Sequence, residues 1–397
     1  MNILEEIQNC PVEWKELGEV CSVKKGKQLN KNLLTEDGLY PAYNGGQTYS
    51  GRTNDYNVEA NTIIVSQGGA SAGFVNFVDT KFWANAHCYY ILPDETRVNN
   101  RFVYHFVKMN QKYLMDFQHG AGIPALKADK LSKLLLPIPP LEIQEKIVQI
   151  LDKMTEYVTE LASELASRKK QYSFYRDKLL SFEDEVYQVE WKTLGEVCDV
   201  RDGTHDSPNK KAFGKYLITS KNVKNGSINF DSAYFISESD FDNINKRSKV
   251  DIDDLLFTMI GTVGEIAHIT EEPDFAIKNV GLIKTQSRIL ARYLLHYLQS
   301  TYAKDYISSN SSKGSQVFLG LGKLRNFPIP YVEPKIQSRI VQVLDNFDTV
   351  CNDFNIGLPK EIELRQKQYE YFREKLLTFT AEGVYPDSGQ WHGHNLT

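Results

Sequence analysis

The sequence of 397 residues predicts an α+β protein with an internal repeat, in which two mixed α/β modules alternate with two long helices. The segment VEWKELGEVC at residues 12–21 returns as VEWKTLGEVC at residues 189–198, with nine of the ten positions identical. Each copy is followed, more than 100 residues later, by a proline-rich turn and a long stretch in which apolar residues recur at helical spacing. The chain is therefore expected to consist of two similar halves related by a pseudo-twofold axis.

Composition excludes several classes of protein. Hydrophobic residues make up 41% of the chain, which is enough to bury a core and argues against disorder. Lys and Arg number 46 against 51 Asp and Glu, giving a net charge of -5, so a nucleic-acid-binding surface must be a local patch. The five cysteines form no C-x-x-C pair, which argues against a disulfide framework and a zinc ribbon.

The odd number of cysteines and their spacing also indicate a reducing compartment. The N-terminus lacks the basic start and apolar run of a signal peptide, and no stretch of about 18 apolar residues is present to span a bilayer. We therefore expect a soluble, cytoplasmic protein.

The two modules are expected at residues 1–140 and 186–333. Both combine short apolar runs, Gly- and Asn-rich turns and helical stretches, which is typical of mixed α/β structure. Residues 63–77 and 255–269 each read as an apolar run, a glycine-containing turn and a second apolar run. This pattern predicts a hairpin at the equivalent place in each module.

The long helices are expected at residues 141–185 and 334–380, with a separate tail at 381–397. The first begins after the PIPP turn at 137–140 and would be on the order of 60 Å long at 1.5 Å per residue. The second begins after a similar PIP turn, and Gly357 and Pro359 predict a break near 357–359. Pairing of the two as an antiparallel coiled coil would give the pseudo-twofold; the alternative is that each helix packs only on its own module.

Apolar residues spaced mostly by three and four define the seam of this coiled coil. The predicted seam residues are Ile143, Ile147, Ile150, Met154, Leu161, Leu165, Tyr172, Leu179, Ile336, Ile340, Val343, Phe347, Tyr369, Phe372 and Leu376.

The sequence shows none of the motifs that catalysis on nucleic acids or nucleotides commonly uses. It contains no phosphate loop of the form G-x-x-x-x-G-K-[ST], no [DN]-P-P-[FY] tetrad to hold an extruded adenine, and no glycine fingerprint for a dinucleotide. The eight histidines show no metal-ligand spacing. We expect a non-catalytic chain with no metal and no cofactor of its own.

Basic residues cluster directly after each copy of the repeated segment, among Gly, Ser, Thr, Asn and Gln. Such a mixture suits contacts to phosphates and to base edges, although a charged run is also typical of ordinary solvated surface. The candidate DNA-binding residues chosen on this basis are Lys24, Lys25, Lys27, Lys31, Gln47, Arg52, Gln67, Lys127, Arg201, Thr204, His205, Lys210, Lys211, Lys215, Ser220, Lys221, Asn222, Lys313 and Gln316.

The combination of features resembles the specificity subunit (HsdS) of type I restriction-modification systems. The resemblance is carried by two variable modules, each closed by a P-I-P segment and a helix that ends R-x-K-Q-Y-x-x-x-R-[DE]-K-L-L, at residues 168–180 and 365–377. DGTHDSP at 202–208, GAGIPALK at 120–127 and the GLP break at 357–359 are also similar to that family. Together these marks cover nearly the whole chain.

The resemblance implies a division of labour. Each module would be a target recognition domain that reads one half of a split, asymmetric site in double-stranded DNA. The paired helices would fix the spacing of the two halves and dock two methyltransferase (M) subunits and the restriction (R) subunits. S-adenosylmethionine, ATP and magnesium would be bound by those partners.

Two other classes of function stay open at this point. One is a coiled-coil scaffold whose two modules bind protein or polysaccharide. The other is a free-standing enzyme, such as a divergent nuclease, whose motifs have changed beyond recognition.

Overall fold

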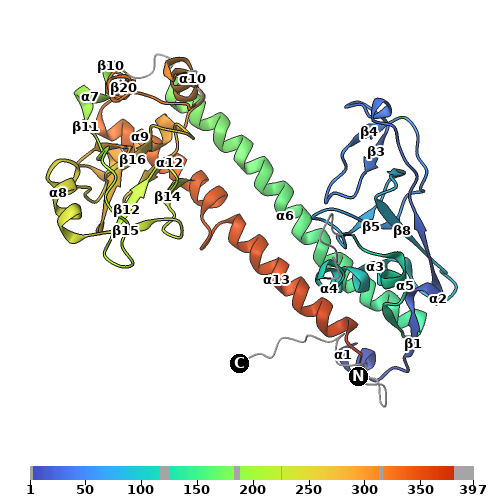
Figure 1. The fold of residues 1–397 in the computed structure, drawn as a ribbon. Helices are drawn as coiled ribbons and strands as arrows, with labels where there is room; N and C mark the ends of the chain where they lie inside the picture. The colour runs from blue at the N-terminus through green and yellow to red at the C-terminus, as the bar shows by residue number, and fades with distance from the viewer. Residues whose placement is uncertain are drawn as a thin grey trace. The chain divides into compact units, whose positions relative to one another are not determined.

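The structure is a computed structural model that describes residues 3–116, 125–182, 188–224, 226–312, 314 and 316–379. The chain divides into two compact units, residues 1–161 together with 362–397, and residues 162–361. Each unit contains β-sheets and helices, and the long helix α6 (Leu141–Ser181) contributes its first part to one unit and its second part to the other (Figure 1). The predicted α+β class with two mixed modules is confirmed.

The first unit contains a four-stranded antiparallel sheet in the order β2-β8-β5-β6 and a three-stranded sheet in the order β4-β3-β7. In the smaller sheet β3 is antiparallel to β4 and parallel to β7. The strands of this unit are β1 (Glu13–Glu16), β2 (Cys21–Lys25), β3 (Tyr40–Tyr43), β4 (Gly51–Thr53), β5 (Thr62–Ser66), β6 (Val75–Val78), β7 (Trp83–Ala84), β8 (Cys88–Pro93) and β9 (Leu135–Ile138). Its helices, besides the start of α6, are α1 (Ile3–Gln8), α2 (Leu17–Val20), the 3-10 helix η1 (Lys31–Leu33), α3 (Asn100–Met109), α4 (Gln111–Asp116), α5 (Ala128–Ser132) and most of α13 (Leu358–Leu377).

The second unit repeats both sheets. Its four-stranded sheet has the order β11-β19-β16-β17, and its three-stranded sheet has the order β15-β12-β18 with β12 parallel to β18. The strands are β10 (Glu190–Thr193), β11 (Asp199–Asp202), β12 (Lys215–Thr219), β13 (Val223–Lys224), β14 (Ser227–Ile228), β15 (Tyr234–Ile236), β16 (Leu255–Thr258), β17 (Ile266–His268), β18 (Phe275–Lys278), β19 (Val280–Lys284) and β20 (Pro328–Tyr331). The helices are the end of α6, α7 (Leu194–Val197), α8 (Glu238–Ser248), α9 (Arg288–Leu298), α10 (Thr301–Asn310), α11 (Leu321–Arg325) and α12 (Pro334–Asn352).

The predicted hairpins form one side of each large sheet, with β6 and β17 as the edge strands. β5 pairs with β6 and β16 pairs with β17, both antiparallel. All residues of β5 and β16 are buried, because the sheet is covered on both faces and the apolar runs are therefore continuous. The repeat thus persists in three dimensions where the sequences of the modules have diverged.

A two-stranded ribbon closes each module. β1 pairs with β9, which places Trp14 opposite Pro137, and β10 pairs with β20, which places Trp191 opposite Pro330. The ribbon therefore joins the repeated W-K-x-L-G-E-V-C segment to the P-I-P turn at the other end of the module.

A buried glutamine then fixes the start of each long helix. The Gln144 amide N–H donates to the carbonyl of Pro139 at 2.8 Å, and its oxygen accepts from the backbone N–H of Asn99 at 2.7 Å. At the equivalent position, the Gln337 amide N–H donates to the carbonyl of Val332 at 2.8 Å. Because these glutamines satisfy carbonyls of the preceding turn, the direction of the helix is set by its own module.

The long helices pack with each other antiparallel. In the first unit, Ile143 and Ile147 at the start of α6 share a core with Leu376 near the end of α13. In the second unit, Leu180 near the end of α6 shares a core with Ile340 in the first half of α12. The start of one helix region thus packs with the end of the other in both units.

Most predicted seam residues occupy this interface. Those that are buried are Ile143, Ile147, Leu161, Tyr172, Ile340, Tyr369 and Leu376. Those that are partly buried against a core are Ile150, Met154, Leu165, Leu179, Ile336, Phe347 and Phe372.

The prediction for Val343 is wrong. Its side chain is 44% exposed, whereas the neighbouring Leu344 is fully buried. Buried positions here fall at Ile340, Leu344 and Cys351, with Phe347 partly buried between them, so the seam advances by four residues where three were expected.

The second long helix is interrupted where Gly357 and Pro359 predict a break. α12 ends at Asn352 and α13 begins at Leu358. A Cβ atom at Gly357 would lie 2.4 Å from the carbonyl oxygen of Thr349, so the tight connection requires glycine. Within the described part of the chain, no helix combines the length and the apolar character needed to cross a membrane.

Candidate nucleic-acid interface

One edge of each large sheet gathers the loops that carry polar and basic side chains. Because β2, β8, β5 and β6 alternate in direction, the ends of β2 and β5 lie beside the starts of β8 and β6. We call this edge the first loop edge; it consists of residues 26–28, 44–47, 67–69, 84–87 and 125–127. The same alternation in the second unit forms the second loop edge, residues 203–207, 219–222, 259–261, 278–280 and 316–319.

Backbone hydrogen bonds join the loops of the first edge. The N–H of Lys27 donates to the carbonyl of Ala84 at 2.9 Å, and the N–H of Gln67 donates to the carbonyl of His87 at 2.8 Å. The carbonyl of Gln67 in turn accepts from the N–H of Leu126 at 2.7 Å. These bonds hold segments from four parts of the sequence in one surface.

The second loop edge is joined in the same way. The N–H of Thr204 donates to the carbonyl of Ile277 at 3.0 Å, and the Ser220 hydroxyl donates to the carbonyl of Asn279 at 3.1 Å. The N–H of Leu319 donates to the carbonyl of Met259 at 2.9 Å.

At each edge an equivalent glycine, Gly26 or Gly203, lies where the chain passes close to the backbone of another segment; we call it the crossing glycine. A Cβ atom at Gly26 would lie 2.2 Å from the carbonyl oxygen of Asn85, and one at Gly203 would lie 2.4 Å from that of Ile277. Only glycine allows the chain to pass this close to the neighbouring strand. The two edges therefore share one backbone frame and differ in the side chains that they present.

Several predicted residues lie on or directly beside these edges. In the first unit they are Lys24, Lys25, Lys27, Gln47, Gln67 and Lys127, all exposed except the half-buried Gln67. In the second unit they are Thr204, His205, Ser220, Lys221 and Gln316, of which His205, Lys221 and Gln316 are exposed.

His205 is held in a defined orientation. Its ring nitrogens lie 2.8 Å from Asn279 Oδ1 and 3.0 Å from Asp202 Oδ2. The side chain is nevertheless 66% exposed. A fixed, exposed polar ring is suited to contact with a ligand at the edge.

Other predicted residues lie elsewhere. Lys215 pairs with Asp274 at 2.6 Å, at the end of β12 remote from Thr219, whose neighbour Ser220 is on the second loop edge. Lys210 and Lys211 lie beside β15 at the same remote end, where the N–H of Lys211 donates to the carbonyl of Phe235.

Two predicted residues of the first unit also lie away from the loops of the first edge. Lys31 is in the short 3-10 helix η1, beyond that edge. The Arg52 guanidinium donates to the carbonyls of Gly38 and Leu39 at 2.6 and 2.9 Å. Arg52 therefore serves to hold the loop before β3.

The choice of Asn222 as a base-reading residue needs correction. The side chain is 1% exposed, its Oδ1 accepts from the backbone and hydroxyl of Thr219, and its Nδ2 donates to Asn229 and Ser232. An asparagine with both ends of its amide engaged and buried supports the turn. Lys313, residues 120–124 and the tail at 381–397 lie outside the described residues.

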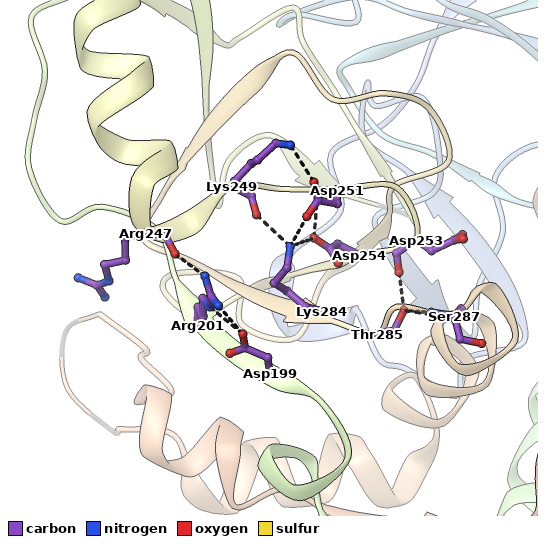
Figure 2. A network of polar contacts seen from close by, with 10 residues as sticks. All are labelled: Asp199, Arg201, Arg247, Lys249, Asp251, Asp253, Asp254, Lys284, Thr285 and Ser287. Atoms are coloured by element: carbon purple, nitrogen blue, oxygen red, sulfur yellow. Dashed lines mark hydrogen bonds and ion pairs between the residues drawn. The ribbon is translucent and has the colours of Figure 1, made fainter.

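Arg201, which precedes Gly203 on β11 as Lys24 precedes Gly26 on β2, takes part in a polar network with Asp199 and Arg247 (Figure 2). Its guanidinium contacts Asp199 Oδ2 at 2.6 and 2.9 Å and donates to the carbonyl of Arg247 at 2.9 Å. The pair lowers the pKa of Asp199, mainly through the hydrogen bond from Arg201. The charge of Arg201 is therefore largely balanced by its neighbour.

Lys284 is the centre of the rest of this network. Its ammonium group contacts Asp251 at 2.7 Å and Asp254 at 2.9 Å and donates to the carbonyl of Lys249 at 3.1 Å (Figure 2). Burial disfavours its charged form, but the hydrogen bonds that it donates to the two aspartates leave its pKa raised. Since Lys284 pairs with Asp199 in the strand register, the network lies at the end of β19 opposite the loop edge and stabilises the sheet there.

Sequence reasoning missed two residues of the edges. His87 is exposed between β7 and β8, directly before the apolar run that predicts β8. Asn279 lies between β18 and β19 with a φ of 54° and contacts His205. His87 lies in a three-residue connection and Asn279 is a one-residue connection, and the position of each at the edge follows only from the strand order.

Within the described ranges, no three His, Cys, Asp or Glu side chains come together as a metal site would require. The edges offer amides, hydroxyls, imidazoles and ammonium groups. These are donors and acceptors for phosphate oxygens and base edges.

Comparison with known proteins agrees with this geometry. The family described as "Type I restriction modification DNA specificity domain" matches residues 11–167 and 188–364, one match for each half of the chain. The chain therefore belongs to the family of type I restriction-modification DNA specificity proteins.

Two curated relatives match over nearly their full length. The chain is 29% identical to the EcoR124I/EcoR124II specificity subunit of Escherichia coli, over 96% of this chain and 97% of that protein. It is 32% identical to a putative type I restriction enzyme specificity subunit of Haemophilus influenzae, over 94% of this chain and 97% of the relative.

Two solved structures share the fold. The S subunit of a type I restriction-modification system from M. genitalium superposes with a TM-score of 0.60 at 22% identity, covering 94% of this chain and 98% of that one. A chain from a study of complex assembly and conformational transition in the type I R-M system gives a TM-score of 0.58 at 17% identity, with 93% and 98% covered. The prediction that the chain is a type I specificity subunit is confirmed.

Proposed function

We propose that each loop edge reads one half of a split DNA target, so that this chain selects the site at which a type I complex acts. The observation that carries the proposal is the shared frame of the two edges. The strand order and the crossing glycine are the same, whereas the exposed Lys25 and Lys27, beside and on the first edge, are replaced by the buried Asp202 and the half-buried Thr204 at the second. One frame with two sets of side chains suits the reading of two different half-sites, which makes the target asymmetric.

The reading of bases requires no catalysis by this chain. The edges supply hydrogen-bond donors and acceptors and positive charge, and methyl transfer or cleavage belongs to partner subunits. We place the protein in the cytoplasm, with S-adenosylmethionine, ATP and magnesium bound by the M and R subunits.

The long helices are proposed to dock those subunits. Phe174 on α6 and Tyr371 on α13 occupy equivalent positions in the repeated helix ends and are 61% and 52% exposed. Exposed aromatic side chains on a helix are typical anchors of protein interfaces. Their recurrence in both halves fits the docking of two M subunits, one on each half.

Sequencing that detects N6-methyladenine in single DNA molecules tests the proposal. The chain is co-expressed with its neighbouring methyltransferase subunit in a host that lacks other adenine methylation, and the control omits the chain. We expect methylation at one split, asymmetric motif only when the chain is present. Absence of a motif from cells that contain the soluble complex would contradict the proposal and favour a scaffold, and magnesium-dependent cleavage by the chain alone would favour a nuclease.

A further inference from the structure

Each unit contains, away from its loop edge, the same cluster of four side chains. In the first unit the Arg101 guanidinium and the His105 imidazole from α3 both contact the carboxylate of Asp152 on α6. His105 Nε2 lies 2.7 Å from Asp152 Oδ1, and His105 Nδ1 lies 3.1 Å from the hydroxyl of Tyr369 on α13.

The second unit repeats the cluster with the same four residue types, and its arginine also contacts Asp348 Oδ2 at 2.8 Å. Arg292 and His296 from α9 contact Asp345 on α12, with His296 Nε2 at 2.7 Å from Asp345 Oδ1. His296 Nδ1 lies 2.8 Å from the hydroxyl of Tyr172 on α6. We call these two groups the first and second tetrads.

Burial makes the direction of the hydrogen bonds clear. Both histidine side chains are 0% exposed, and desolvation lowers the pKa of each below its ordinary value. A neutral imidazole has one donor and one acceptor. Nε2–H therefore donates to the aspartate, which leaves Nδ1 to accept from the tyrosine hydroxyl.

Each tetrad combines residues from both halves of the sequence. In the first tetrad, arginine, histidine and aspartate come from the first half of the sequence, but Tyr369 comes from the end of the helix that follows the second module. In the second tetrad the relation is reversed, because Tyr172 comes from the helix that follows the first module. Each module is thus held by a tyrosine that the other half of the sequence supplies.

The helix that receives the tyrosine also supports the sheet that carries the loop edge. α3 packs on β6 and β8, and α9 packs on β17. The starts of β6 and β8 and the start of β17 lie at the respective loop edges. A change in the seating of α3 or α9 is therefore transmitted to the edge through packed side chains.

We propose that Tyr369 is a positioning residue for the first loop edge and Tyr172 for the second, so that each half of the sequence controls recognition by the other. The inference rests on the proposed function, because it is expressed through the two half-sites. Neither tyrosine touches DNA in this scheme; each acts through its histidine and the helix that carries it.

The test uses the full chain in complex with its methyltransferase subunit. The variants are Y369F and Y172F, which remove one hydroxyl and keep the ring. The matched controls are Y157F and Y175F, at tyrosines of α6 that lie in the first and the second unit and are 42% and 44% exposed. Hydrogen exchange is measured in α3 and α9, and binding is measured with duplexes that carry a base-pair change in one half-site.

For Y369F we expect amide exchange in α3 to rise about two- to tenfold, the range for loss of one buried hydrogen bond, with α9 unchanged. Discrimination at the half-site read by the first module should fall by a similar factor, with the other half-site unaffected. Y172F should give the mirror image, and the controls should resemble the wild type.

Two results would overturn the inference. One is that each variant affects the module of its own half, or both modules equally. The other is that exchange responds in the crossed pattern while half-site discrimination stays unchanged, which would reduce the tetrads to structural supports. A wild-type complex with no sequence preference would instead overturn the proposed function, and this inference with it.

Discussion

At the scale of single residues, the loop edges separate side chains that are available from those that are occupied. Lys27 and Gln67 lie on the first edge, whereas the polar groups of Arg52 and Asn222 form hydrogen bonds with neighbouring loop residues. The sequence marks all four as polar residues in turn-rich segments. Which of them face outward depends on contacts such as that between Asn222 and Ser232, which the local pattern does not specify.

The basic residues on and directly beside the first edge should govern the response of binding to salt. Replacing Lys24, Lys25 and Lys27 by glutamine removes positive charge that we place near DNA phosphates. The slope of log K against log salt should fall by about 0.9 for each phosphate contact that is lost. Binding of the complex to its target duplex at several salt concentrations measures this.

Lys210 and Lys211 provide the control, because they lie at the end of their sheet remote from the second edge. Replacing both by glutamine should leave the slope unchanged. An unchanged slope in the triple variant, or a lower slope in the control, would show that the patch has been assigned to the wrong surface.

At the scale of elements, the repeats and the helical periodicity predict the helices, hairpins and breaks that depend on the local sequence. The hairpins at β5–β6 and β16–β17 and the interruption before α13 lie where the pattern indicates. Val343 shows the limit, since a spacing of three or four fits the sequence equally well and packing selects Leu344. The tetrads show the same limit. The pattern R-x-x-x-H is visible in the sequence at Arg101 and again at Arg292, but it does not indicate that His105 contacts a tyrosine 264 residues away.

The exposed aromatic residues of the long helices should matter for assembly and little for folding. Replacing Phe174 and Tyr371 by glutamate places charge where we expect apolar contact with the methyltransferase subunits. Assembly of the complex, followed by analytical ultracentrifugation, should weaken by at least tenfold, because central aromatic anchors typically contribute about 2 kcal/mol or more.

The exposure of both side chains predicts a thermal midpoint of the isolated chain close to that of the wild type. A complex that assembles normally with both substitutions would remove these residues from the docking surface. Single substitutions would then show whether each half docks one subunit, through the loss of one copy from the complex.

At the scale of the whole molecule, one structural frame is used twice. The sheets, the closing ribbons, the buried glutamines and the tetrads recur in both units, and the side chains of the loop edges do not. The sequence predicts the frame because it is repeated. It does not predict the bases that are read, because a few loop residues on a common frame determine them.

The most direct test of this account is an exchange of one module. Residues 12–140 are replaced by the corresponding segment of another family member whose Arg and His equivalents of Arg101 and His105 are present, and adenine methylation is sequenced in cells that contain the hybrid and its methyltransferase subunit. We predict a motif in which one half is new, the other half is unchanged and the spacing between them is kept. A motif changed in both halves, or not changed at all, would contradict the claim that each loop edge reads its own half of the target.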